Sequence, residues 1–469
     1  MTSSSPPLAP PNRSLPRAHA ANNSADSKSR LAVYGFILLI VMGVLLRLLI
    51  VVFAGNRINA PWGGTGDAPA YFLLAQNVAS GKGYAYAGHP TAYRPPAYVL
   101  LLAGLIKFFP DHSLAAMRGL QFLMGLSVAV LCARVAGRFW GGSGERTTLL
   151  IALFFPTLVI MTGEILTEAT ATLMSAAFLY LLVRFWEEPR WFHLVAVAIV
   201  IGMAALVRFN MALFGFVALA AIFLRKGGLP KWSAAIVTTA LSLLVVSPWM
   251  IRNLVVFHGS SSALLTTQSG NDVVTGLLAP QGRALPGDAE RIRAAVGWVI
   301  PQELETNDPS RNLMPEEPAL NRQAWTAGLR LWRAAGWRLI PITAGKVSYF
   351  WLSTDQLFWT ATFRPWVRAA RAAGVVVYWM LLILAMAGWY RLRIRDPKMA
   401  TLLLFYAVLV TILHMPFNMN TRYRMPFMDP LIAVLAGGAA LHWGSRIAGR
   451  ARLDPTEQSQ LPFVVERAS

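Results

Sequence analysis

Long apolar runs separated by short polar segments set the pattern of this 469-residue chain. Runs of roughly 17–25 apolar residues match the length that an α-helix needs to cross a bilayer. Two shorter or interrupted apolar stretches, 97–109 and 338–353, predict helices at the membrane interface. The pattern predicts an all-α polytopic membrane protein with about ten transmembrane helices, at residues 31–53, 117–137, 147–163, 167–186, 191–208, 210–225, 232–250, 373–390, 399–414 and 425–443.

The polar segments predict how the chain is divided. Residues 1–30 are rich in Ser, Pro, Ala and Asn and lack apolar periodicity, which predicts a disordered cytoplasmic tail. After it come an N-terminal transmembrane module (31–250) with the first external loop (54–116), a mixed external domain with interfacial helices (251–372), C-terminal transmembrane helices (373–445) and a cytoplasmic tail (446–469).

Basic residues predict the orientation. With the amino terminus inside, every short inner loop is basic, as in Arg138 and Arg146 or Arg225 and Lys226, and the positive-inside rule requires this. Counting either interfacial stretch as a full span would place basic loops outside. Both termini are therefore predicted to lie inside. The net charge of +20 is explained without a nucleic-acid partner, and part of it is expected to bind anionic membrane lipids.

Composition and motifs exclude several classes of protein. Hydrophobic residues make up 55% of the chain and charged residues 14%, which excludes an ordinary soluble protein. The single cysteine, Cys132, excludes an intrachain disulfide and a Cys-based metal site. No HExxH, Walker A, GxSxG or CxxC pattern occurs, so zinc proteolysis, ATP-driven pumping and serine hydrolysis have no support.

Asp67 is the candidate catalytic residue. It follows the first span, and a carboxylate so close to a bilayer is unfavourable unless it is partnered or used. It can act as a general base toward an acceptor hydroxyl. It can also cap the helix that follows, because Asp is a preferred N-cap and a proline stands two positions later. The two roles are compatible.

Basic residues at the predicted outer ends of the spans are candidates for binding a donor phosphate. Arg422 and Arg424 oppose the positive-inside bias, and arginine is suited to bidentate phosphate recognition. For the other candidates, snorkelling to lipid headgroups, an aromatic-belt position or an exposed turn explains the residue at least as well. These other candidates are Arg94, Arg208, Arg252 and Lys82.

A third group is expected to contact the sugar or the acceptor. Glu164 and Glu168 stand four residues apart, which predicts one face of a helix and suits a metal or a cationic group. The helix dipole alone also favours acids at this position. Asn271 belongs to a loop whose backbone amides are able to meet a ligand. The aromatic members of the group are Tyr71, Tyr84 and Tyr93.

In chain order, these segments resemble the GT-C superfamily of membrane glycosyltransferases. The likeness is greatest to the branch of dolichyl-phosphate-mannose protein mannosyltransferases and bacterial lipid A aminoarabinose transferases. It extends over residues 31–443, and the order and common sidedness of the pieces make it fairly specific. The matching pieces are Gly66-Asp67 through Tyr71, Gly81-Lys82-Gly83-Tyr84, Tyr93-Arg94-Pro95-Pro96, Gly163-Glu164 through Glu168, Arg208, Pro248-Trp249 through Asn253, and Arg422-Tyr423-Arg424-Met425-Pro426.

The resemblance implies a polyprenyl-phosphate sugar donor and transfer outside the cytoplasm. It maps the family's essential acid onto Asp67 and makes the N-terminal module the catalytic one. No cofactor is expected to be required and no metal ligand is identified, while a divalent metal stays an open alternative. The protein mannosyltransferases carry an adjacent Asp-Glu pair, but Ala68 follows Asp67 here. The acceptor therefore stays open among a lipid, a glycan and a protein of the cell envelope.

The sequence thus predicts a multi-pass glycosyltransferase of the bacterial inner membrane with its active site on the periplasmic or external side. The alternative is a transporter or flippase for an anionic lipid-linked sugar. A transporter needs its polar residues near the middle of the membrane, and many transporters show duplicated halves. Here the polar residues gather at outer helix ends, and no internal repeat is visible.

Overall fold

The computed structural model describes residues 16–59, 67–86, 88–278, 317–354, 365–417, 419 and 421–450. These residues are mostly helical, and β1 (Ala85–Tyr86) and β2 (His89–Pro90) form a short antiparallel hairpin. The predicted all-α polytopic membrane fold is confirmed. Residues 279–316 and 355–364 of the predicted external domain, and parts of both predicted tails, lie outside the described residues, and the predicted domain division stays a prediction.

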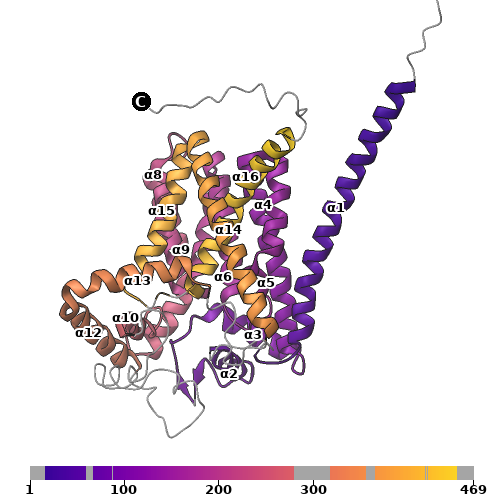
Figure 1. The fold of residues 1–469 in the computed structure, drawn as a ribbon. Coiled ribbons are helices and arrows are strands. Elements are labelled where there is room, and N and C mark those ends of the chain that lie inside the picture. Colours follow the sequence, from indigo (N-terminus) through magenta and orange to yellow (C-terminus); the bar gives the residue numbers. More distant parts are fainter. Residues whose placement is uncertain are drawn as a thin grey trace, which may run out of the picture.

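Long helices stand side by side as a bundle (Figure 1). Seven helices in the described residues are long and apolar enough to cross a membrane. Shorter apolar helices accompany them, namely α3 (Pro96–Phe108), α7 (Trp191–Val207) and η1 with α8 (Phe209–Leu224). The seven are α1 (Pro16–Ala54), α4 (Ser113–Phe154), α6 (Glu168–Glu187), α9 (Lys231–Val256), α14 (Pro365–Arg395), α15 (Pro397–His414) and α16 (Thr421–Arg450).

The helix α4 is a hairpin of two arms. Gly141 has a φ of 73°, which favours glycine and interrupts the helix. The chain reverses there, because Arg134 Nη1 lies 3.0 Å from Glu145 Oε1 although eleven residues of straight helix would separate them by about 16 Å. The predicted spans 117–137 and 147–163 fall on the two arms, the second continuing into α5 (Pro156–Ile160). All ten predicted spans therefore fall on helices.

The helix α1 leans away from the bundle in Figure 1 and is held to it by a buried arginine. Arg47 Nη1 donates to the carbonyl oxygen of Leu158 at 2.7 Å, and Arg47 Nη2 donates to that of Ala152 at 2.8 Å. These carbonyls flank the break before α5, where they lack helical partners. At its other end α1 begins at Pro16, inside the segment predicted to be a disordered tail. Alanines recur there and favour helix.

The helix α16 is the central member of the bundle, since 83% of its apolar window is buried. It packs closely against α14, because a Cβ added at Gly388 would lie 1.9 Å from the carbonyl oxygen of Leu435. Phe427 on α16 meets the ring of Phe214 edge-on at 5.9 Å, and Phe214 stacks on Phe178 at 4.2 Å. This packing fixes the amino-terminal turn of α16, which carries two of the candidate arginines.

One end of the bundle carries the short helices (Figure 1). They are α2 (Asp67–Ala79), α3, α10 (Ser269–Leu278), α12 (Glu317–Ala335) and α13 (Leu339–Leu352), so both predicted interfacial stretches are helical. Tyr71 on α2 meets Tyr98 on α3 edge-on with ring centroids 5.2 Å apart. The start of α1 and the end of α16 both lie at the opposite end, as the predicted topology requires. The short helices place several charged side chains at the ends of the long ones.

Candidate functional site

Five charged side chains from separate segments meet at the end of the bundle that carries the short helices. Asp67 Oδ1 accepts a hydrogen bond from Arg94 Nη2 at 2.7 Å, and Asp67 Oδ2 accepts one from Arg422 Nη1 at 2.5 Å. Arg422 Nε also donates to Glu168 Oε1. Arg208 Nη2 lies 3.6 Å from the same Glu168 oxygen. These five residues, here called the charged cluster, were all predicted site residues.

Each member of the charged cluster stands at the end of a helix. Asp67 is the first residue of α2, and Glu168 is the first residue of α6. Arg422 is the second residue of α16, and Arg208 has an extended backbone between α7 and η1. Arg94 precedes two prolines that fix the entry into α3. Helix ends thus bring together residues that are far apart in the sequence.

Three guanidinium groups face two carboxylates, so the charged cluster has a surplus of one positive charge. The side chains of Arg94, Arg208 and Arg422 are only 6%, 12% and 11% exposed. Arg208 Nη1 is buried and has no hydrogen-bond partner among the described residues. A buried donor without a partner is unfavourable. The arrangement is therefore suited to a further anion.

The arginines also determine the ionisation of Asp67. Burial alone would raise its pKa, but the positive charges and hydrogen bonds of Arg94 and Arg422 hold the pKa of this carboxyl well below its usual range. Asp67 is thus ionised, and both of its oxygens are engaged. A carboxylate in this state is a weak proton acceptor.

Tyrosine rings lie beside two of the three arginines of the charged cluster. The Arg94 guanidinium carbon lies 4.8 Å from the ring centroid of Tyr71 and 5.1 Å from that of Tyr93. That of Arg208 lies 5.3 Å from the ring of Tyr423. Such cation–π contacts hold a guanidinium in place without using all of its N–H donors. Tyr71 and Tyr93 were predicted, whereas Tyr423 was noted only as part of a motif.

Arg424 was predicted to bind the donor phosphate with Arg422, but the structure places it elsewhere. It is fully buried, and its Nη1 donates to the carbonyl oxygens of Phe350, Trp351 and Ser353 at 2.9–3.4 Å. These carbonyls end α13. Residues two apart on a helix point in different directions, so the first turn of α16 sends one arginine to the charged cluster and the other into the bundle.

Arg252 and Tyr84 support the segment that carries Arg94. Arg252 Nη1 donates to the carbonyl oxygen of Thr91 at 2.7 Å, and its Nη2 donates to that of Tyr84 at 2.9 Å. The Tyr84 hydroxyl donates to the carbonyl oxygen of Arg94 at 2.8 Å. Both residues therefore act on backbone next to the charged cluster. Lys82 lies in the exposed turn after α2 and is not among the side chains that contact Asp67 or Glu168.

Glu164 does not share a helical face with Glu168, so that prediction was wrong. Glu164 lies in an irregular segment before α6, which begins at Glu168. Side chains of α4 replace the missing helical bonds: Arg118 Nε donates to the carbonyl oxygen of Gly163 at 2.7 Å, and Gln121 Nε2 to that of Glu164 at 2.6 Å. Glu164 is buried beside Arg118, while Glu168 alone joins the charged cluster.

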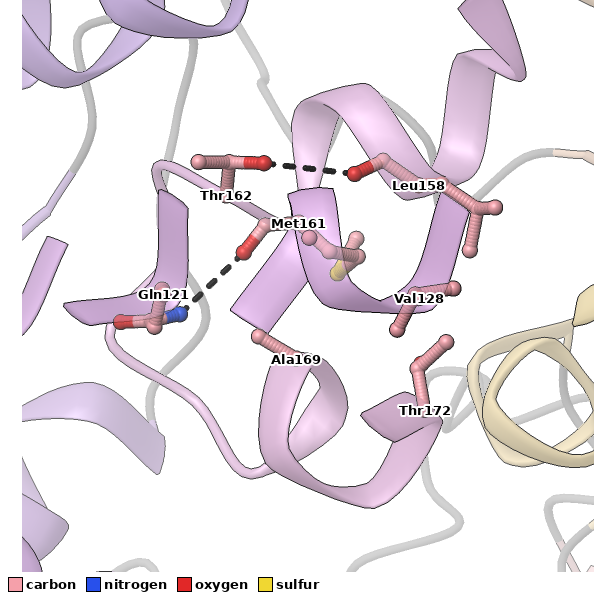
Figure 2. A pocket seen from close by; sticks show the side chains of 8 residues that line it. Gln121, Val128, Leu158, Met161, Thr162, Ala169 and Thr172 are labelled. Atoms are coloured by element: carbon pink, nitrogen blue, oxygen red, sulfur yellow. Dashed lines mark hydrogen bonds between the residues drawn. The ribbon is translucent and has the colours of Figure 1, made fainter. Parts of the chain in front are cut away.

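A small cavity lies next to this irregular segment, between α4, α5 and α6 (Figure 2). In it Gln121 donates to the carbonyl oxygen of Met161, and Thr162 donates to that of Leu158. Most of the lining is apolar. Ala169, which follows Glu168, belongs to the lining, but no member of the charged cluster does. The lining residues are Gln121, Gly125, Val128, Leu158, Met161, Thr162, Ala169 and Thr172.

Asp272 on α10 is a carboxylate that the sequence did not single out as a site residue. It is partly buried and interacts electrostatically with Arg94, Asp67 and Arg208 of the charged cluster. Burial raises the pKa of Asp272 to about 7. The only sequence signal was its place beside the predicted Asn271, which is buried on α10. Among the described residues, no group of three or more His, Cys, Asp or Glu side chains is placed to hold a metal ion.

Comparisons with known proteins agree with this fold. A family model described as dolichyl-phosphate-mannose-protein mannosyltransferase matches residues 93–251. The oligosaccharyltransferase of Archaeoglobus fulgidus, tethered with an acceptor peptide, aligns with a TM-score of 0.52 and 15% identity, covering 92% of this chain and 52% of that chain. The same enzyme with Zn and sulfate aligns with a TM-score of 0.50 and 14% identity, covering 88% and 50%. This chain thus spans about half the length of that oligosaccharyltransferase.

A third solved structure is ArnT from Cupriavidus metallidurans bound to undecaprenyl phosphate. It aligns with a TM-score of 0.42 and 16% identity, covering 90% of this chain and 81% of that chain. No curated protein matches the chain by sequence. The family match and the oligosaccharyltransferase fold confirm the resemblance to the GT-C superfamily that the sequence predicted.

Proposed function

We propose that this protein is a membrane glycosyltransferase that moves a sugar from a polyprenyl-phosphate donor to a cell-envelope acceptor. The site lies on the outer face of a bacterial inner membrane in this proposal, as the positive-inside rule predicts. The observation that carries it is the charged cluster with its surplus positive charge at one end of the bundle. The match of residues 93–251 to a mannosyltransferase family model supports the reaction class.

The donor phosphate is the anion that the charged cluster would bind. Arg208 Nη1 already offers an unused donor, while Arg94 and Arg422 would exchange part of their carboxylate contacts for phosphate oxygens. A phosphate leaves the sugar as an anion and needs no general acid. Fixed guanidinium groups stabilise the charge that develops on it. A site at the end of the bundle gives access to a lipid donor that stays in the bilayer.

The sequence predicts Asp67 as the general base, and this role requires that Asp67 first lose contact with at least one of its two arginines. Its pKa stays far below the working pH while both arginines hold it. Donor binding would have to draw at least one of them to the phosphate before Asp67 accepts a proton. The acceptor stays open among a lipid, a glycan and a protein, and the peptide seen with the oligosaccharyltransferase illustrates only the last class.

The rival function is transport of an anionic lipid-linked sugar. Transporters bind their substrates near the middle of the membrane, whereas the charged cluster stands at helix ends. Purified protein in detergent, supplied with a polyprenyl-phosphate sugar and a panel of lipid, glycan and peptide acceptors, separates the two. Transfer of labelled sugar supports the proposal, because no transport can occur without a membrane. Binding of the donor without transfer to any acceptor favours the rival.

A further inference from the structure

Asp272 differs from the two carboxylates of the charged cluster in how it is bonded. Both oxygens of Asp67 accept hydrogen bonds from arginines, and Glu168 is 1% exposed between Arg208 and Arg422. Asp272 is less buried than Glu168, and its Oδ1 receives a long hydrogen bond of 3.4 Å from Gln268 Nε2. Asp272 is therefore a carboxylate without a direct arginine contact among the described residues, beside a cluster whose own carboxylates are bonded to arginines.

The helix α10 that carries Asp272 is held firmly at its amino-terminal side. The backbone N–H of Gly270 donates to Asn321 Oδ1 on α12 at 2.7 Å. Just before α10, the Thr266 hydroxyl donates to the carbonyl oxygen of Tyr93 at 2.9 Å, and the N–H of Thr267 donates to that of Ala92 at 3.1 Å. The first bond joins α10 to α12, and the other two join the start of α10 to the segment that ends in Arg94.

The carboxyl-terminal side of α10 is held against the segment that leads into α16. Lys346 Nζ on α13 donates to the carbonyl oxygens of both Gly276 and Met415, at 2.9 and 2.5 Å. A Cβ added at Gly276 would lie 2.4 Å from the carbonyl oxygen of Pro416, so the backbones are in close contact. Asp272 is thus fixed between the segment that ends in Arg94 and residues 415–417, which precede α16.

We propose that Asp272 is the proton acceptor of the glycosyl transfer. This inference rests on the proposed function and assigns its proton transfer to Asp272 in place of Asp67. The acceptor hydroxyl gives its proton to an Asp272 oxygen while its own oxygen forms a bond to the anomeric carbon of the sugar. The bond between that carbon and the phosphate oxygen breaks, and its electron pair stays on the polyprenyl phosphate, which the arginines hold. Asp272 then releases the proton to water.

The surroundings of Asp272 are consistent with this task. The groups that act on it are Gln268 on its own helix, Asp67 on α2, and Arg94 and Arg208, while it acts in turn on Tyr423 of α16. Burial outweighs the arginines and leaves its pKa at about 7, whereas the pKa of Asp67 is far lower. A general base is most effective when its pKa lies near the working pH. Two carboxyls whose environments push their pKa values apart commonly divide such roles.

The test compares purified Asp272→Asn with the wild-type protein in the detergent transfer assay. Turnover is expected to fall roughly 10²–10⁴-fold, with the donor Michaelis constant changed less than about twofold. In the wild type, kcat/KM should rise with pH through an apparent pKa of about 7, because the base must be deprotonated. This rise of kcat/KM with pH, here called the acid limb, should be absent from the residual activity of Asp272→Asn. Asp272→Glu should restore part of the turnover.

Two further variants make the outcome decisive. Asp111→Asn alters an exposed carboxylate between α3 and α4 and should behave as wild type. Asp67→Asn raises the surplus positive charge of the charged cluster and frees donors of Arg94 and Arg422, so it should not weaken donor binding, and it should keep the acid limb. An Asp272→Asn protein that transfers sugar at the wild-type rate with the same acid limb overturns the inference while the proposed function stands. Absence of transfer by the wild type with every acceptor overturns the proposed function, and the inference with it.

Discussion

Replacing Arg422 by alanine should weaken donor use without unfolding the protein. Its guanidinium joins two carboxylates, donating from Nη1 to Asp67 Oδ2 at 2.5 Å and from Nε to Glu168. The substitution removes a guanidinium group that would contact the donor phosphate. A lost charge-assisted hydrogen bond is worth about 1.5–3 kcal/mol, which corresponds to roughly a 10- to 150-fold rise in the donor Michaelis constant. Arg422→Lys should recover only part of this, because lysine keeps the charge but lacks the planar fork.

A purely structural role for Arg422 makes a different prediction, and a double variant separates the two. Arg422→Ala leaves the buried Glu168 with Arg208 at 3.6 Å, so part of any loss could come from an under-compensated charge. Arg422→Gln combined with Glu168→Gln removes that charge together with its partner. If Arg422 binds the phosphate, the double variant should regain thermal stability and keep the raised donor Michaelis constant.

The assay is transfer of labelled sugar at a series of donor concentrations, with thermal melting of each variant in the same detergent. Arg330→Ala on the exposed face of α12 removes an arginine at the same end of the protein and serves as the matched control. Donor Michaelis constants within twofold of wild type for both Arg422→Ala and the double variant would show that the charged cluster does not bind the donor phosphate.

Three further expectations follow from buried groups away from the charged cluster. Arg424→Ala should lower the melting temperature, since it removes the buried guanidinium that donates to three carbonyls at the end of α13, while the donor Michaelis constant of the folded fraction stays at the wild-type value. Burial raises the pKa of Glu317 from 4.5 to about 7, so the stability that this residue contributes should fall as pH rises from about 4.5 to about 7. The melting temperature of Glu317→Gln, measured across the same pH range, should not show this decrease. Gly276→Ala should reduce both melting temperature and turnover, because its Cβ would meet the carbonyl oxygen of Pro416 at 2.4 Å; unchanged values would exclude the close contact.

The apolar pattern was sufficient to predict the spans, because lipid makes long apolar runs compulsory. It also located the turn within α4: the loop between the predicted spans 117–137 and 147–163 contains Gly141, where the chain reverses. The resemblance, read together with the charge bias, brought Asp67, Glu168 and Arg422 into one prediction. These signals are local or topological and need no knowledge of how the helices pack.

The errors and omissions arise where packing decides. Arg422 and Arg424 both lie at the predicted outer end of the last span, so the sequence gives them the same interpretation. The apolar window of α16 is buried on most sides, so apolar periodicity does not show which of the two arginines faces the charged cluster. The spacing of Glu164 and Glu168 predicts one helical face, because the sequence does not reveal the hydrogen bonds from α4 that stabilise an irregular backbone at Glu164. Asp272 was overlooked because its position depends on how α10 packs against two distant segments.

The chemistry of the three carboxylates follows from their partners rather than from their residue type. A buried arginine is unfavourable without a counter-charge, so a site built for a phosphate must satisfy its guanidinium groups while the phosphate is absent. Asp67 and Glu168 do this, and the same ion pairs hold the pKa of Asp67 below the range of a useful base. A carboxylate that is free to accept a proton must therefore stand outside those pairs but within reach of the same substrate. Among the described residues, Asp272 stands outside those pairs and interacts electrostatically with Arg94 and Arg208, which is why we assign the proton transfer to it.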